Sequence, residues 1–114
     1  MTNNNTFALG LDFGSNSVRC VVVNLQNGQE CGVSVWDYPS GDRGVLTDSA
    51  NPHVARQRPS DFVQGITEAV KPALAQALDT PGFAPAHVIG IGVDTTGSTP
   101  IPVDNTMTPL GNKT

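Results

Sequence analysis

The sequence has little of what marks a nucleic-acid-binding, membrane-spanning or secreted protein. Only 6 lysines and arginines stand against 10 aspartates and glutamates, so the net charge is −4 and no basic run is available for a nucleic-acid partner. No apolar stretch approaches the ~18 residues that a membrane-spanning helix needs. The opening residues, Met-Thr-Asn-Asn-Asn-Thr, have neither the charged nor the apolar part of a secretion signal. The composition therefore predicts a cytoplasmic protein that binds neither nucleic acid nor a membrane.

Cysteine is also scarce, since only Cys20 and Cys31 are present. The pair Asn27-Gly28 is typical of a tight hairpin turn, and a hairpin centred there does not place the two cysteines opposite each other. We therefore predict two free thiols rather than a disulfide. Two cysteines and two distant histidines do not make the ligand set of a zinc site, and His53 and His87 suggest no function.

Apolar runs bounded by turn residues predict a sheet in this α/β chain. Four strands are predicted, at 7–12, 18–25, 30–38 and 87–94, and the first of them is apolar enough to be covered on both faces. A short fifth strand at 98–103 is predicted at a sheet edge, because it contains two prolines. Residues 40–58 show no periodicity and are predicted to form a long exposed loop.

One helix is predicted after Pro59, with Ser60 or the residue before Pro59 as its N-cap. Apolar residues recur at helical spacing and predict a single stripe that faces the sheet. They are Phe62, Val63, Ile66, Ala69, Val70, Ala73, Leu74, Ala77 and Leu78. Pro72 removes one helical hydrogen bond and is predicted to kink or split the helix, although the stripe keeps its phase across it.

The order of these elements predicts the topology. Hairpins make the first three strands antiparallel, and a right-handed crossover through the helix brings the fourth strand parallel to the first. This is a mixed sheet with helical cover, of the ribonuclease-H-like type. In such a fold, the turn after the first strand and the end of the fourth strand meet at one edge of the sheet. We therefore expect the segments at these two positions to line one cleft.

Residues 10–19, Gly-Leu-Asp-Phe-Gly-Ser-Asn-Ser-Val-Arg, join the first two predicted strands by a polar turn. A carboxylate, hydroxyls, backbone N–H groups and a guanidinium gathered in this way can hold a metal-bound polyphosphate. The segment lacks the Gly-Lys-Ser/Thr ending of a P-loop and the G-x-G-x-x-G spacing of a dinucleotide site. An ordinary hairpin turn is the alternative, because Gly, Ser and Asn favour turns for local reasons.

The segment resembles the first phosphate motif of the sugar-kinase, Hsp70 and actin superfamily, and within it the FGGY family of carbohydrate kinases. Residues 90–100, Gly-Ile-Gly-Val-Asp-Thr-Thr-Gly-Ser-Thr-Pro, sharpen the resemblance. Many FGGY kinases carry Gln-x-His-Gly here, whereas the L-ribulokinases carry Val-Asp-x-Thr-Gly-Ser-Thr-Pro, which is the form of this chain. Residues 12–19 also look like the ribulokinase version of the first motif.

The resemblance implies a role for each residue of the first motif. Asp12 matches the aspartate that lies near the Mg²⁺ of the nucleotide, often through water, and Arg19 matches an arginine that touches phosphate or anchors the turn. Residues that match those approaching the β- and γ-phosphates of ATP are Gly14, Ser15, Asn16 and Ser17. The alternatives are a turn cap for Asp12 and packing on Trp36 for Arg19.

The second motif lines the sugar pocket in the family. Thr96, Gly97 and Ser98 match the positions that contact the sugar, partly through backbone groups. Asp94 stands where other members have Gln, and we expect it to support the loop or to contact the sugar directly. The alternative is that residues 95–98 only form a turn at the end of a strand.

The resemblance implies that residues 1–114 are the amino-terminal part of the first domain of an FGGY kinase, with the second domain absent. The full enzyme is then expected to phosphorylate L-ribulose in arabinose catabolism, at O5, with MgATP. The catalytic aspartate of the family lies beyond residue 114, so no catalytic residue is assigned here and the chain alone is expected to be inactive. Exposed sheet edges predict that it self-associates, and the full enzyme could be a homo-oligomer.

Three alternatives remain from the sequence. The first is another FGGY kinase, for D-ribulose, xylulose or glycerol. The second is a non-catalytic, actin-like module that binds nucleotide and would need no sugar pocket. The third is a plain α/β interaction domain that does not respond to MgATP.

Overall fold

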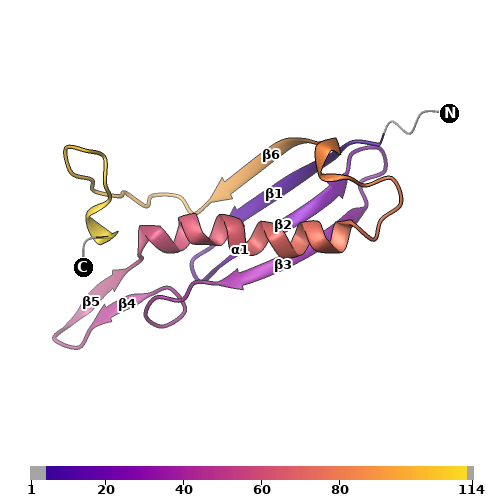
Figure 1. The fold of residues 1–114 in the computed structure, drawn as a ribbon. Helices are drawn as coiled ribbons and strands as arrows, with labels where there is room; N and C mark the ends of the chain where they lie inside the picture. The colour runs from indigo at the N-terminus through magenta and orange to yellow at the C-terminus, as the bar shows by residue number, and fades with distance from the viewer. Residues whose placement is uncertain (1–4, 113–114) are drawn as a thin grey trace.

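The structure is a computed structural model that describes residues 5–112, and its centre is a four-stranded sheet with one long helix on one face (Figure 1). The strand order is β3-β2-β1-β6. The bounds are β1 Phe7–Phe13, β2 Ser17–Asn24, β3 Glu30–Asp37, α1 Pro59–Ala77 and β6 Val88–Thr95. β1 pairs antiparallel with β2 and parallel with β6, and β2 pairs antiparallel with β3. The predicted mixed sheet and crossover are therefore confirmed.

The hairpin between β2 and β3 turns at Gly28, whose φ of +74° explains why glycine suits this position. In the resulting register Cys20 lies opposite Ser34 rather than Cys31. Both cysteines are free, Cys20 buried and Cys31 half-buried, as the sequence predicted.

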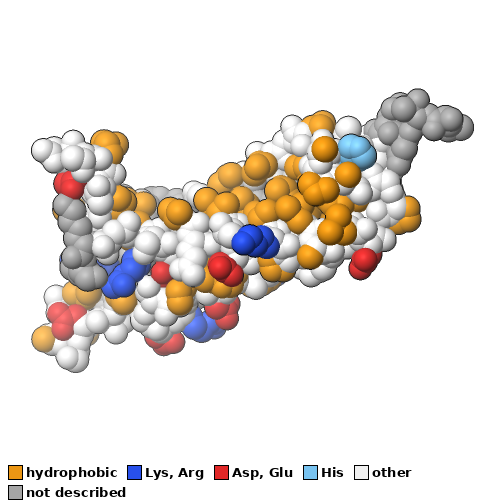
Figure 2. Space-filling model, in the orientation of Figure 1, with side chains coloured by type: hydrophobic (Ala, Val, Ile, Leu, Met, Phe, Trp, Pro, Cys, Tyr) orange, Lys and Arg blue, Asp and Glu red, His pale blue; other side chains and the backbone are white. Residues whose placement is uncertain are grey.

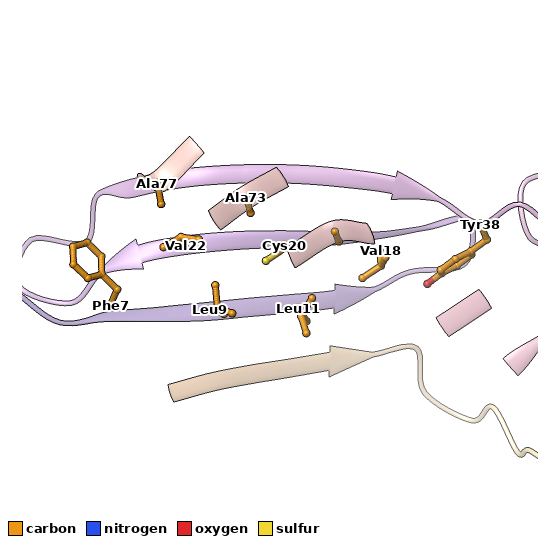
Figure 3. Packing of buried hydrophobic residues seen from close by; sticks show 10 residues of the cluster. Phe7, Leu9, Leu11, Val18, Cys20, Val22, Tyr38, Ala73 and Ala77 are labelled. Carbon is orange, nitrogen blue, oxygen red and sulfur yellow. The ribbon is translucent and has the colours of Figure 1, made fainter. Parts of the chain in front are cut away.

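The core lies between α1 and one face of the sheet (Figure 3). Alternate residues of β1 and β2 point to this face, because side chains alternate along a strand. They are Phe7, Leu9, Leu11, Val18, Cys20 and Val22, all at most 7% exposed. Ala69, Ala73 and Ala77 of α1 close the core from the other side and are fully buried. Phe83, from the turn after α1, packs edge-on against Phe7 at 4.9 Å between ring centroids.

The helix packs on the sheet through small residues, so the predicted broad apolar stripe is only partly right. Its buried line runs at intervals of four through Gly65, Ala69, Ala73 and Ala77. Three larger members of the predicted stripe, Val63, Ile66 and Leu78, are 68%, 45% and 59% exposed. They are exposed because α1 lies over β2 and β3 and leaves the helix-side face of β6 open.

The sequence predicted that Pro72 kinks or splits the helix; α1 is continuous through Pro72, so the split is wrong. Arg58, the residue before Pro59, occupies the N-cap position in an extended conformation, which fits one of the two predicted caps. Its side chain makes no capping bond. Instead, the side-chain oxygen of Asn112 accepts a hydrogen bond of 2.9 Å from the Ser60 N–H, so a residue far along the chain satisfies the start of the helix.

Residues 40–58 are largely exposed, but they do not form the long loop that the sequence predicted. They contain a second, two-stranded sheet in which β4 (Leu46–Asp48) pairs antiparallel with β5 (Asn51–Arg56). The tip is held by side chains, because the Asp48 carboxylate accepts the Ala50 N–H at 2.9 Å and the Asn51 amide oxygen accepts the His53 N–H at 3.0 Å. The hairpin is short and exposed, so neither of its faces has to be apolar. Its sequence therefore lacks the alternation of apolar and polar residues from which a strand is predicted.

The predicted fifth strand at 98–103 is also wrong. This segment makes only an isolated bridge between Val103 and Pro109. Prolines at 100 and 102 have no N–H to donate to a ladder, which favours this outcome. The remaining short elements are the 3₁₀ turns η1 (Pro85–His87) and η2 (Leu110–Asn112). His87 lies in η1, where its Nδ1 is 3.1 Å from the Gly82 carbonyl oxygen.

The two edges of the main sheet differ. At the β3 edge, the side chain of Gln76 bonds both backbone groups of Val33, accepting its N–H at 3.0 Å and donating to its carbonyl at 2.8 Å. At the β6 edge, within the described residues, no strand pairs with β6 on its outer side. Ile89, Ile91 and Val93 of β6 are 61–67% exposed, and Figure 2 shows hydrophobic side chains gathered on this side of α1.

The face of the sheet opposite α1 is open as well, so the prediction that β1 is covered on both faces is wrong for the described residues. Only the odd-numbered side chains of β1 are buried by the helix. Gly10 and Asp12 belong to the other face, where polar side chains at the ends of the neighbouring strands also lie.

Candidate functional site

Three charged side chains of the predicted site lie side by side on the open face of the sheet. Asp12 of β1 is the register partner of Arg19 in β2 and of Asp94 in β6. Residues paired in this way project to the same face, so the row Arg19–Asp12–Asp94 crosses three strands. All three side chains are exposed, and they line an open hollow of about 400 Å³ together with Gly10 and Gly92.

The two glycines keep this hollow open, because they stand in the positions next to the two aspartates on the same face. A Cβ at residue 92 would meet nothing within 4 Å, whereas one at residue 10 would lie 3.0 Å from a methyl of Val21. The two predicted motifs, 10–19 and 90–100, thus meet at one end of the sheet as the sequence predicted.

The turn after β1 is tied down through its carbonyl groups. The Tyr38 hydroxyl donates to the Gly14 carbonyl at 3.0 Å, Gln57 Nε2 donates to the Ser15 carbonyl at 2.9 Å, and the Tyr38 N–H donates to the Asn16 carbonyl at 3.0 Å. Within residues 5–112, the N–H groups of Ser15 and Asn16 have no hydrogen-bond acceptor. The donor set therefore fits a phosphate chain, and the exposed Asp12 carboxylate fits its magnesium ion.

Tyr38, which directly follows β3, is the buried support of this turn. It is 2% exposed and packs edge-on against Phe62 and Trp36, at 5.2 and 6.4 Å between ring centroids. Burial, followed by the negative charges of Asp12 and Asp61, raises the pKa of Tyr38 to about 12. Asp61 is itself buried and accepts hydrogen bonds from the N–H and hydroxyl of Ser40, at 3.2 and 2.9 Å.

Tyr38 makes the free energy of unfolding depend on pH in the alkaline range. Its folded pKa of about 12 lies above the ordinary value of 10, so the fold favours the neutral phenol. This contribution is fully present below pH 10 and is lost as the pH rises toward 12. We expect Tyr38→Phe to lower the free energy of unfolding by about 1 kcal/mol at pH 8 and to flatten its alkaline decline. Urea unfolding of both proteins between pH 8 and 11 measures this, and two parallel curves would contradict it.

The predicted sugar-pocket residues do not gather around one hollow. Thr96 lines a groove of about 260 Å³ on the helix side of the sheet, with the hydroxyl residues Thr95 and Thr99 and five apolar residues. The apolar ones are Phe13, Phe62, Val63, Ile66 and Ile101. Gly97 and Ser98 are exposed and belong to neither hollow. Asp94 lies on the opposite side, beside Asp12.

The loop after β6 is held by its own residues. The hydroxyls of Thr96 and Thr99 are 3.0 Å apart, and the Thr99 hydroxyl also donates to the Gly97 carbonyl at 3.4 Å. Ser98 has a φ of +57°, a conformation that is uncommon for serine. Among the described residues the Asp94 carboxylate makes no hydrogen bond, so the expected support of this loop by the Asp94 side chain is not seen.

The structure rules out one of the alternatives for Arg19. Its strand neighbour Val18, which lies opposite Trp36, is fully buried beneath α1. Arg19 lies opposite Val35 and projects to the other face, so packing of Arg19 on Trp36 is wrong. The side chain of Asp12 likewise makes no capping hydrogen bond within residues 5–112.

No group of three or more His, Cys, Asp or Glu side chains in residues 5–112 could hold a metal ion on its own. Over the same residues, no helix has both the length and the apolar character needed to cross a bilayer.

Comparison with known proteins places this geometry in context. A model described as the FGGY family of carbohydrate kinases, N-terminal domain, matches residues 7–113. Ribulokinase of Vibrio parahaemolyticus is 42% identical over 102 residues, which are 90% of this chain and 17% of that protein. Ribulokinase of Geobacillus thermodenitrificans is 35% identical over 108 residues, 91% of this chain and 18% of that protein.

Among solved structures, one described as a xyloylose kinase from Brucella ovis superposes with a TM-score of 0.70 over 91% of this chain and 19% of that one. At 18% identity this likeness shows the fold alone. The chain thus spans about a fifth of the length of the proteins that it matches.

Proposed function

Because this chain belongs to the FGGY family of carbohydrate kinases, we propose that it is the amino-terminal part of an ATP-dependent kinase for L-ribulose. The observation that carries the proposal is the row Arg19–Asp12–Asp94, next to a turn whose N–H groups at Ser15 and Asn16 are free to donate. Ribulokinases at 42% and 35% identity support the choice of sugar. A cytoplasmic location and a place in arabinose catabolism belong to the same proposal.

Bound MgATP would supply the phosphoryl group and the metal ion. The N–H groups of Ser15 and Asn16 would donate to phosphate oxygens, with Gly14 leaving the backbone accessible and the Ser17 hydroxyl adding a donor. Arg19 would offset the negative charge of the phosphates, and the Asp12 carboxylate would hold Mg²⁺ directly or through water. The chain thus supplies positioning and charge for phosphoryl transfer.

The sugar would be held by the second motif. Asp94 offers a carboxylate on the open face of the sheet, and Thr96, Gly97 and Ser98 of the loop that follows β6 offer two hydroxyls and exposed backbone groups, so the sugar would lie where the strand ends between the two faces. A site that pairs each sugar hydroxyl rejects an analogue that lacks one, because its own polar groups are then left unpaired. The base that would orient the attacking hydroxyl is not assigned to this chain, so residues 1–114 alone should release no ADP from ATP and L-ribulose.

A chimera tests this function. Residues 7–113 replace the matching segment of the Vibrio ribulokinase, and ADP release is measured with L-ribulose, D-ribulose, D-xylulose and glycerol. We expect turnover with a clear preference for L-ribulose. Preference for another polyol would keep the kinase and discard the ribulokinase assignment. A folded chimera that binds MgATP but is inactive with every sugar would favour a nucleotide-binding module instead.

The isolated chain is proposed to self-associate through the helix-side face of β6. Ile91 is 63% exposed on a strand with an unpaired edge, so contact between two copies removes apolar surface from water. Sedimentation of residues 1–114 should show concentration-dependent association, which Ile91→Glu weakens. Val35→Glu is the matched control, since Val35 is 52% exposed on the opposite face. A sharp monomeric profile of the unmodified chain would contradict this prediction.

A further inference from the structure

The β4–β5 hairpin is anchored to the turn after β1 by both of its legs. Just before β4, the carbonyl of Arg43 accepts a hydrogen bond of 2.9 Å from the Asn16 side-chain amide. Just after β5, Gln57 Nε2 donates to the Ser15 carbonyl at 2.9 Å. These contacts join residues that are 27 and 42 positions apart in the sequence. A segment that the sequence predicted to be a loop therefore reaches the turn at two points.

The bond from Gln57 has a direct effect on a neighbouring donor. The Ser15 carbonyl and the Asn16 N–H belong to one planar trans peptide group, so they point in opposite directions. When Gln57 holds the carbonyl from one side, the Asn16 N–H is directed to the other side. The Tyr38 hydroxyl acts in the same way on the peptide group between Gly14 and Ser15.

Fixing the orientation of these peptide groups raises binding affinity most where their N–H groups contact a ligand. When a loop becomes ordered only on binding, the lost conformational entropy lowers its affinity for the ligand. A loop that is already ordered does not have this cost. Within residues 5–112, the Asn16 N–H has no acceptor in the protein, so its orientation is not needed for a backbone hydrogen bond of the fold. The geometry fits a donor that is kept ready for an anion.

We propose that Gln57 is a positioning residue, which orients the Asn16 N–H toward the phosphate chain of the nucleotide by holding the Ser15 carbonyl. The inference rests on the proposed function for the identity of the ligand, but not for the effect of Gln57 on the turn. It assigns a role to the base of the β4–β5 hairpin, which lies outside both sequence motifs. Gln57 acts through the turn and does not itself contact the nucleotide.

The first test needs no activity and uses the whole 114-residue chain. Gln57→Met keeps the length of the side chain and removes the hydrogen-bond donor. Gln57→His restores an N–H donor at a similar distance from the backbone. Gln64→Met is the matched control, because Gln64 is an exposed glutamine of α1. We expect the NMR order parameter of the Asn16 amide to fall from about 0.85 to below about 0.6 in Gln57→Met, and to recover in Gln57→His. An unchanged value in Gln57→Met would overturn the inference.

The second test adds a ligand. Magnesium tripolyphosphate is titrated into the same proteins while the amide signals of residues 14–17 are followed, and we expect about tenfold weaker binding for Gln57→Met than for Gln64→Met. In the chimera, the KM for ATP should rise by a similar factor while the KM for the sugar stays unchanged. Equal effects on both KM values would show a general structural role and overturn the inference.

The two proposals fail in different ways. If the unmodified chain ignores magnesium tripolyphosphate and the unmodified chimera releases no ADP, the proposed function is wrong, and the order parameters still decide whether Gln57 holds the turn. If the unmodified proteins respond and Gln57→Met responds equally, the proposed function stands and the role of Gln57 does not.

Discussion

Asp12→Asn is expected to lower the turnover of the chimera by about 100-fold or more, with little change in its thermal stability. The carboxylate is exposed and makes no hydrogen bond within residues 5–112, so the fold loses little when its charge is removed. The rate of the proposed reaction should fall strongly, because the neutral side chain of asparagine cannot offset the charge of Mg²⁺ as a carboxylate does. Removal of one preorganised electrostatic partner typically costs 10² to 10³ in rate.

The matched control for this experiment is Asp79→Asn. Asp79 is exposed just beyond the end of α1, at the opposite end of the helix from the phosphate turn. Turnover should be unchanged in this variant, whose loss of charge is the same. Steady-state ADP release and a thermal melt of each protein complete the comparison. An Asp12→Asn chimera with wild-type turnover, or one that fails to fold, would contradict the role that we propose for this carboxylate.

Gly32→Ala is expected to lower the free energy of unfolding by more than about 3 kcal/mol, which is most of the stability of a marginal domain. Gly32 lies in β3 beneath α1, next to the backbone of Ala73. A Cβ at this position would overlap the carbonyl oxygen of Ala73 and lie 3.0 Å from the carbonyl carbon. The obstacle is helix backbone, which cannot change rotamer, so α1 must move away from β3 and open the core.

The control is the same substitution at Gly90, in β6, where an added Cβ would meet nothing within 4 Å. Gly90→Ala should be neutral or stabilise by a few tenths of a kcal/mol, since alanine restricts the unfolded chain. Thermal unfolding of the two variants should therefore differ by more than about 10 °C. Similar midpoints for Gly32→Ala and Gly90→Ala would show that α1 does not pack on β3 as closely as the structure has it.

Much of the fold follows from local pattern. Apolar runs or alternation bounded by turn residues predicted β1, β2, β3 and β6 to within one residue at each end. The Asn27-Gly28 turn fixed the β2–β3 hairpin, and the single crossover fixed the parallel pairing of β1 with β6.

The errors occurred where local pattern carries no information about neighbours. The β4–β5 hairpin is exposed and held by the side chains of Asp48 and Asn51, so it shows no apolar period. Pro72 fits the helix because a proline removes only one backbone donor, and packing of the small residues on either side keeps α1 in one piece. Segment 98–103 had the composition of an edge strand but no partner to pair with.

Some properties of the candidate site likewise follow from the sequence, and others depend on the tertiary structure. The sequence alone determined the residue types at the strand ends, and so the chemistry of the site: carboxylates at 12 and 94, a guanidinium at 19, and small donors between them. Tertiary structure alone decided that Asp94 joins Asp12 and Arg19 on one face while Thr96 turns to the other. It also brought Tyr38 and Gln57 to the turn, since hydrogen bonds between residues 24 and 42 positions apart depend on packing that no local spacing records.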